Sequence, residues 1–283
     1  MRIDAHQHFW QYEPERHSWI SNEMAVIRRD FFPGDLAPIL KDLHIAGTIA
    51  VQADETREET RFLLDLAEKN DFIKGVVGWI NLHTTDLAME LSAYAHKPKL
   101  VGFRSVIQGA PDAKYLTNKI FQQNLKQLAK TPYTYDLLVY HNQLPALVKM
   151  TDKLPDNPLI LDHLGKPDIK NKQFKDWKEN LRILSTNPRI YCKISGIITE
   201  ADYANWTYDD LMPYMETAAE FFGTDRICFG SDWPVCLVAG NYKQVHDTVD
   251  KFIRQLTIAE QEKIFGLNAI QFYKLNNGSS TQG

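Results

Sequence analysis

The 283-residue sequence has few cysteines and no long apolar run, and each shortage excludes a class of protein. Three cysteines, Cys192, Cys228 and Cys236, are too few and odd in number for a disulfide framework. No stretch approaches the roughly 20 apolar residues that a membrane-spanning helix needs. The first residues also lack the apolar core of a secretory signal peptide. We therefore expect a cytoplasmic protein whose thiols are reduced.

The sequence also lacks an excess of positive charge. Its 32 Lys and Arg residues are outnumbered by 36 Asp and Glu residues, so the formal net charge is -4. Nucleic acids and anionic membranes are bound by positively charged protein surfaces, so neither is expected as a partner. A composition of 44% hydrophobic and 24% charged residues excludes disordered and fibrous classes. The expected partner is a small molecule, and a homo-oligomer is left open.

Short apolar runs alternate with longer segments of helical periodicity along the chain. Eight runs are predicted as strands: 2–5, 48–52, 75–80, 100–104, 136–140, 159–162, 190–194 and 226–229. They are continuously apolar, which is typical of parallel strands covered on both faces. Eight such units without a linker predict an α/β fold, a single-domain (β/α)8 barrel over residues 1–275. A polar, disordered tail is expected over 276–283, and no glycine-rich nucleotide loop is found.

Polar side chains follow these runs, at the end of the barrel strands that carries the chemistry in such folds. His6 and His8 lie two apart on an extended segment, so their side chains can converge on one metal ion or carbonyl. His141 and His163 follow two other runs. Asp232 follows the eighth run, where its carboxylate would act as a general base. The alternative for Asp232 is a helix N-cap or turn residue.

Other side chains near the strand ends are candidates for substrate binding. Arg104 ends an apolar run and would bind a carboxylate or polarise a carbonyl, unless it forms a surface ion pair. Lys166 lies in a segment that is equally consistent with an ordinary loop. Trp10, Trp79 and Trp233 flank strand ends and could stack on a sugar ring or pack structurally.

Three motifs together resemble the amidohydrolase superfamily, in the branch that holds sugar-acid lactonases. They are DAHQHFW at 4–10, DHLGKP at 162–167 and FGSDWP at 229–234, and the resemblance runs from residue 1 to about 275. Within that branch the chain is similar to L-fuconolactonases and L-rhamnonolactonases. The resemblance implies a distorted barrel of the metal-dependent-hydrolase type. It also implies a carboxylic-ester hydrolase that opens an aldonolactone of the L-fucono or L-rhamnono type to the aldonic acid.

The resemblance further implies roles for the strand-end residues. Asp232 would be the acid/base of the eighth strand, and His6, His8, His141 and His163 would surround the reacting carbonyl. Our own hypothesis is that Asp232 activates water while Arg104, His163 and His141 hold the oxyanion. Members with two metals bridge them with a lysine on strand four, but the run 100–105 contains none. We therefore expect either no required cofactor or a single divalent ion, zinc by ligand type, on His6, His8, His163 and Asp232.

Three alternative functions remain open at this stage. A pyrone-dicarboxylate lactonase would need several strand-end arginines for two carboxylates, whereas Arg104 alone is obvious. An aminocarboxymuconate-type decarboxylase would use a similar histidine pair, metal and aspartate. The non-enzyme alternative is a sugar-binding protein on an inactive barrel. The sequence does not determine which aldonolactone or ring size is used.

Overall fold

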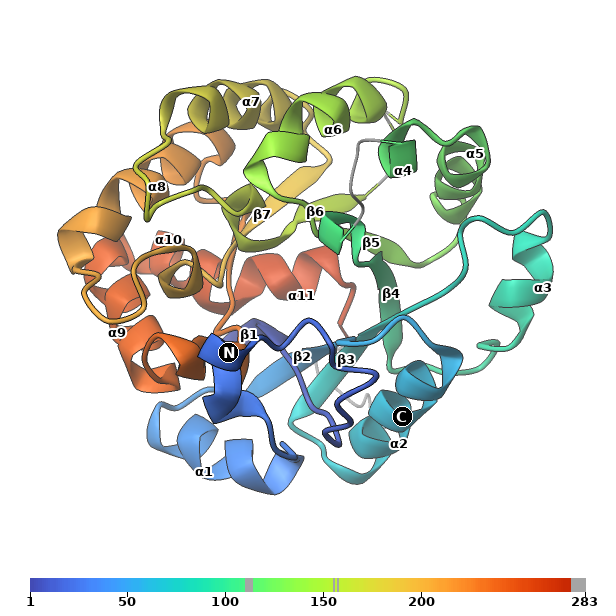
Figure 1. The fold of residues 1–283 in the computed structure, drawn as a ribbon, viewed down its shortest axis with the longest axis horizontal. Coiled ribbons are helices and arrows are strands. Elements are labelled where there is room, and N and C mark those ends of the chain that lie inside the picture. Colours follow the sequence, from blue (N-terminus) through green and yellow to red (C-terminus); the bar gives the residue numbers. More distant parts are fainter. Residues whose placement is uncertain (110–113, 155, 157, 276–283) are drawn as a thin grey trace, which may run out of the picture.

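The computed structural model describes residues 1–109, 114–154, 156 and 158–275, and the predicted tail at 276–283 lies outside them. Within these ranges, eight parallel strands stand in chain order around one barrel, with helices outside (Figure 1). The strands are β1 (Ile3–Gln7), β2 (Gly47–Val51), β3 (Ile73–Gly78), β4 (Leu100–Ser105), β5 (Thr134–Leu137), β6 (Leu159–Leu161), β7 (Ile190–Ile194) and β8 (Ile227–Phe229). The predicted (β/α)8 barrel is confirmed.

The helices lie outside the sheet of strands (Figure 1). They are α1 (Pro33–Asp42), α2 (Arg57–Lys69), α3 (Leu87–Ser92), α4 (Lys114–Thr117), α5 (Lys119–Leu128), α6 (Leu144–Thr151), α7 (Lys175–Ser185), α8 (Tyr208–Phe222), α9 (Tyr242–Ile253), α10 (Ile258–Glu262) and α11 (Asn268–Phe272). In α5 the apolar face formed by Phe121, Leu125 and Leu128 is buried. No described helix is long and apolar enough to cross a membrane.

The apolar core has two parts. One lies between the strands and the surrounding helices, and the other fills the barrel and is covered by α11. The second part joins Ile3, Ile49 and Val77 of the strands to Ile270 and Phe272 of α11. All three cysteines are buried and free, as expected for reduced thiols.

The fifth strand departs from its prediction. The run at 136–140 was expected to form it, but β5 ends at Leu137, and residues 141–143 form a 3-10 turn. Leu138 and Val139 are still buried, so the apolar run continues beyond the residues that pair with the neighbouring strands. The expected position of His141 at a strand end is therefore wrong. The polar residue that β5 itself contributes is the buried Asp136.

The barrel closes where β1 meets the segment after β8, and the carboxylate of Asp4 joins the two. One oxygen of Asp4 accepts the backbone N–H groups of His6 (3.0 Å) and Ser231 (2.9 Å). The other accepts the hydroxyls of Ser231 (2.6 Å) and Tyr242 (2.9 Å). Burial raises the pKa of Asp4 to about 6, although these hydrogen bonds favour the charged form. One buried side chain thus sets the spacing of the first and last strands.

This arrangement predicts the effect of removing one hydroxyl. Tyr242→Phe should lower the free energy of unfolding by about 1.5–3 kcal/mol, because a buried carboxylate loses a hydrogen bond. Urea unfolding at pH 7.5 measures the change. Tyr208→Phe is the matched control, since the Tyr208 hydroxyl has no hydrogen bond among the described residues. A Tyr242→Phe change no larger than that control would contradict the role of Asp4.

Candidate active site

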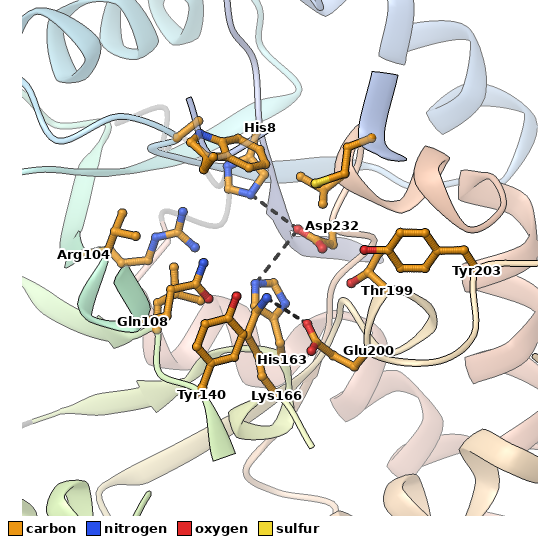
Figure 2. A pocket seen from close by; sticks show the side chains of 16 residues that line it. His8, Arg104, Gln108, Tyr140, His163, Lys166, Thr199, Glu200, Tyr203 and Asp232 are labelled. Atoms are coloured by element: carbon orange, nitrogen blue, oxygen red, sulfur yellow. Dashed lines mark ion pairs between the residues drawn. The ribbon is translucent and has the colours of Figure 1, made fainter. Parts of the chain in front are cut away.

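A cavity of about 230 Å³ opens at the carboxyl ends of the strands. That is smaller than the roughly 300–1,000 Å³ pockets of drug-sized ligands and suits a single sugar ring. Five residues predicted from the sequence line it: His8, Arg104, His163, Lys166 and Asp232 (Figure 2). The remaining lining residues are Trp19, Met24, Ala53, Val106, Gln108, Leu138, Tyr140, Thr199, Glu200, Tyr203 and Val235.

Three imidazoles surround the carboxylate of Asp232 at the floor of this cavity. Oδ1 of Asp232 lies 3.4 Å from Nε2 of His8, 3.8 Å from Nε2 of His6 and 4.0 Å from Nε2 of His163. Burial opposes ionisation of Asp232, but the histidines outweigh it and hold its pKa below the ordinary value. The carboxylate is therefore ionised in the resting site.

The backbone around this cluster is strained, which aims the side chains inward. Asp232 has a φ of 56° and His163 a φ of 54°, both in the left-handed region. Gly196, with a φ of 58°, faces them, and a Cβ there would lie 2.6 Å from Nδ1 of His163. Glycine is therefore required at position 196 for His163 to lie against Ser195, whose Oγ is 2.9 Å from Nδ1.

His6, in β1, and His8, directly after it, converge as their spacing predicts. Their Nε2 atoms are 3.2 Å apart. Nδ1 of His8 lies 2.7 Å from the carbonyl oxygen of Val51, which only accepts, so the proton of neutral His8 is on Nδ1. Its Nε2 lone pair therefore points at His6 and Asp232. Lone pairs that face one another at these distances are stabilised by a proton or a cation between them.

The donor set of His6, His8 and Asp232 fits a divalent metal ion. The three facing atoms are 3.2, 3.4 and 3.8 Å apart. Ligands at about 2.0–2.1 Å from a tetrahedral zinc would lie about 3.3 Å from one another. The Nδ1 atoms of His6 and His8 face Asp162 (3.3 Å) and Val51 (2.7 Å), the outer contacts that metal-bound histidines usually make.

A buried charge network lies beneath the imidazoles, and sequence reasoning missed most of it. Nζ of Lys193, on β7, lies 2.5 Å from Asp136, 2.9 Å from Asp162 and 3.2 Å from Nδ1 of His6. The hydroxyl of Tyr273 donates to Asp136 at 2.8 Å. The available signal was a single lysine or aspartate inside an otherwise apolar strand.

Arg104 completes this network from β4. Its Nη1 lies 3.1 Å from Asp162 and 3.2 Å from Nε2 of His6, and its Nη2 donates to the backbone and side-chain oxygens of Gln52. Burial disfavours ionisation of Asp162, yet Lys193, His6 and Arg104 together hold its pKa well below the ordinary value. Arg104 thus brings positive charge to the cavity wall, with most of its N–H groups already engaged.

Five of the predicted site residues lie outside the cavity lining, and one of them, His6, is fully buried beside Asp232. Nδ1 of His141 contacts the carbonyl oxygen of Lys166 at 3.1 Å. The rings of Trp10 and Trp233 are buried against Phe31 and do not reach the cavity. Trp79 is partly exposed and also absent from the lining. The structure therefore places no predicted tryptophan where it would stack on a sugar, whereas Trp19, which was not predicted, lines the cavity.

The segment between β1 and α1 forms part of the cavity wall through Trp19 and Met24. Arg16 fixes the segment by an ion pair with Asp54 at 2.8 Å and a longer contact with Glu59 at 3.6 Å. Glu59 is buried and accepts the backbone N–H of Ala53 at 3.1 Å. Burial raises the pKa of Glu59 to about 7.

Comparison with known proteins places the chain among amidohydrolases. The model of the amidohydrolase family matches residues 3–275. An L-fucono-1,5-lactonase from Burkholderia multivorans is 36% identical over 97% of this chain and 96% of its own length. One from Burkholderia ambifaria is 33% identical over 99% of this chain and 98% of its own. A crystal structure of a Burkholderia multivorans amidohydrolase with bound zinc has a TM-score of 0.95 and 35% identity, and covers 98% of this chain and 100% of its own.

The buried carboxyl of Glu59 predicts a pH-dependent difference in stability. Because its pKa rises from 4.5 in the unfolded chain to about 7 on folding, the folded protein loses stability as pH rises between these values. Glu59→Gln removes that loss. The free energy of unfolding of the variant minus that of the wild type should therefore increase by up to about 3 kcal/mol between pH 4.5 and pH 8.

Urea unfolding of both proteins across this pH range measures the difference. Glu58→Gln, on the exposed side of α2, is the matched control. A difference between Glu59→Gln and wild type that stays constant with pH would show that the carboxyl is not held in its neutral form.

Proposed function

This chain belongs to the amidohydrolase family, and we propose that, as a lactonase, it opens a neutral aldonolactone of the L-fucono type to the aldonic acid. The observation that carries the proposal is the ionised Asp232 carboxylate among three imidazoles, at the floor of a cavity sized for one sugar ring. The two L-fucono-1,5-lactonases that match along the full chain support the choice of substrate.

In the proposed reaction, Asp232 accepts a proton from water as the water oxygen attacks the lactone carbonyl. The tetrahedral intermediate collapses when the bond between the carbonyl carbon and the ring oxygen breaks. Asp232 then returns the proton to that oxygen, which becomes a hydroxyl of the product. The surrounding histidines keep Asp232 ionised before each turnover, as a proton acceptor must be.

His163 and Arg104 are proposed to stabilise the oxyanion. Burial lowers the pKa of His163 to about 4, so the ring is neutral near pH 7. We assign the Ser195 hydroxyl as the donor to Nδ1 of His163. The ring proton of His163 then lies on Nε2, the nitrogen that faces Asp232. One such donor contributes on the order of 3 kcal/mol to transition-state stabilisation. Arg104 adds fixed positive charge from the opposite wall (Figure 2).

We further propose that His6, His8 and Asp232 hold a single divalent ion, and that the ion is zinc. Two imidazole nitrogens and a carboxylate oxygen are a zinc donor set, and their separations fit a tetrahedral ion. When bound, such an ion polarises a carbonyl and makes water more acidic. A cytoplasmic location is proposed from the three free, buried thiols.

The alternatives are less consistent with the cavity. A pyrone-dicarboxylate substrate needs cations for two carboxylates, but Arg104 is already paired with Asp162 and Lys166 with Glu200. Asp232 and Glu200 both line the cavity and would repel a dianion. The histidine pair and Asp232 would also serve a decarboxylase, but two relatives that match along the full chain are L-fucono-1,5-lactonases. An inactive sugar-binding barrel would not need the strained Asp232.

Asp232→Asn tests the proposed base. The amide cannot accept the proton of water, so kcat for an aldonolactone should fall by about 100–10,000-fold. A pH-indicator assay of acid release measures the rate, and urea unfolding verifies that the fold is intact. Asp65→Asn, on the exposed face of α2, serves as the control and should keep wild-type kcat. Near-wild-type hydrolysis by Asp232→Asn would exclude Asp232 as the base.

Zinc content tests the proposed ion independently of activity. After dialysis against zinc, the wild type should retain one equivalent, because Asp162, which would complete a second set, is already paired with Arg104 and Lys193. His8→Ala should lose the ion, whereas His44→Ala, at an exposed position, should keep it. Two equivalents in the wild type would contradict the assignment. Hydrolysis with and without chelator then shows whether the ion is catalytic.

A further inference from the structure

One ion pair in the cavity wall takes no part in the proposed chemistry. Nζ of Lys166 lies 2.8 Å from Oε1 of Glu200, and the two side chains are 15% and 14% exposed. Both line the cavity, and Figure 2 shows them side by side below His163. The pair therefore lies where a bound ring would touch it, outside the cluster around Asp232.

The backbone holds this pair in a fixed position. Lys166 follows the turn after β6 in the left-handed region, with a φ of 49°. Glu200 ends the 3-10 turn after β7, and its carbonyl oxygen accepts the N–H of Lys170 at 3.1 Å. The carbonyl of Lys166 contacts His141, and its ammonium lies 5.1 Å from the centre of the Tyr140 ring. The turns after β6 and β7 are thus tied together.

Each member of the pair has hydrogen-bonding capacity to spare. The ammonium of Lys166 has three N–H donors and the carboxylate of Glu200 accepts at two oxygens, but one contact joins them. Within the described residues, Oε2 of Glu200 has no hydrogen-bond partner. A sugar hydroxyl both donates and accepts, so two adjacent hydroxyls match an adjacent acceptor and donor.

We propose that Lys166 and Glu200 are specificity-determining residues that bind neighbouring hydroxyl groups of the lactone and reject lactones that carry a carboxylate. The inference rests on the proposed function, since it names how that site selects its substrate. Lys166 donates to one hydroxyl while Glu200 accepts from the next. Glu200 also adds a second negative charge to the cavity beside Asp232, which disfavours anionic substrates.

The test measures kcat/KM of wild type, Glu200→Gln and Lys166→Met on three kinds of lactone. These are a neutral aldonolactone, its deoxy analogues lacking one ring hydroxyl each, and the aldarolactone with a terminal carboxylate. On the neutral lactone, each variant should lose about 10–100-fold, mainly through KM, because a charge-assisted hydrogen bond is removed. For each single variant, one analogue lacks the hydroxyl that the substituted side chain contacts. On that analogue, kcat/KM of the variant and of the wild type should agree within about twofold. Glu200→Gln should also accept the aldarolactone better than wild type does.

Two further proteins separate this outcome from a general structural effect. The double variant Lys166→Met with Glu200→Gln leaves no lone charge in the wall. On an analogue that lacks one contacted hydroxyl, its kcat/KM should fall below that of the wild type only by the loss of the other contact. Glu179→Gln, on the exposed side of α7, removes a pair with Arg182 and should leave every kcat/KM unchanged.

Equal losses on every deoxy analogue, with unchanged discrimination against the aldarolactone, would overturn the inference and leave the pair a structural role. Failure of the proposed function is distinct, because the wild type would then open none of the lactones.

Discussion

The active site depends on the balance of buried charges inside the barrel. Lys193 and Arg104 bring two cations to the floor of the cavity, and Asp136 and Asp162 bring two carboxylates. Removing one member would leave an uncompensated buried charge, which costs several kcal/mol. Because the four groups neutralise one another, His6 can sit above them as a neutral ring, and burial lowers its pKa well below the ordinary value. The Asp232 carboxylate is then the remaining charge of the cluster.

Chain closure is the second constraint. The histidines lie at the start of the chain and Asp232 near its end, yet the N–H of Asp232 donates to the carbonyl of His6 at 2.8 Å. The N–H of His8 donates to the carbonyl of Trp233 at 2.7 Å. These backbone bonds and the buried Asp4 carboxylate place the reacting groups, so the geometry of the site follows from the pairing of the first and last strands.

The fold and part of the site could be predicted from the sequence, because both leave local signals. Continuous apolar runs marked all eight strands, and the rule that chemistry follows the strand ends led to His8, His163 and Asp232. Asp136 and Lys193 could not be predicted, because a lone charge in an apolar run does not reveal its partner 57 residues away. His141 was misplaced because its apolar run continues beyond the paired part of β5. The sequence left both a stacking and a structural role open for the tryptophans, because position beside a strand end does not tell which way a ring turns.

The joining of β1 to the segment after β8 also bears on how the protein is made. A chain emerging from the ribosome acquires its histidines within the first ten residues, and seven strands are complete by Ile194. It lacks the aspartate, and the edge of β1 lacks its neighbour, until β8 and the segment after it begin the last fifth of the chain. Domains fold as units during synthesis, so a nascent or prematurely ended chain carries His6 and His8 on an open sheet without Asp232. The cluster around Asp232 therefore forms only when the barrel closes.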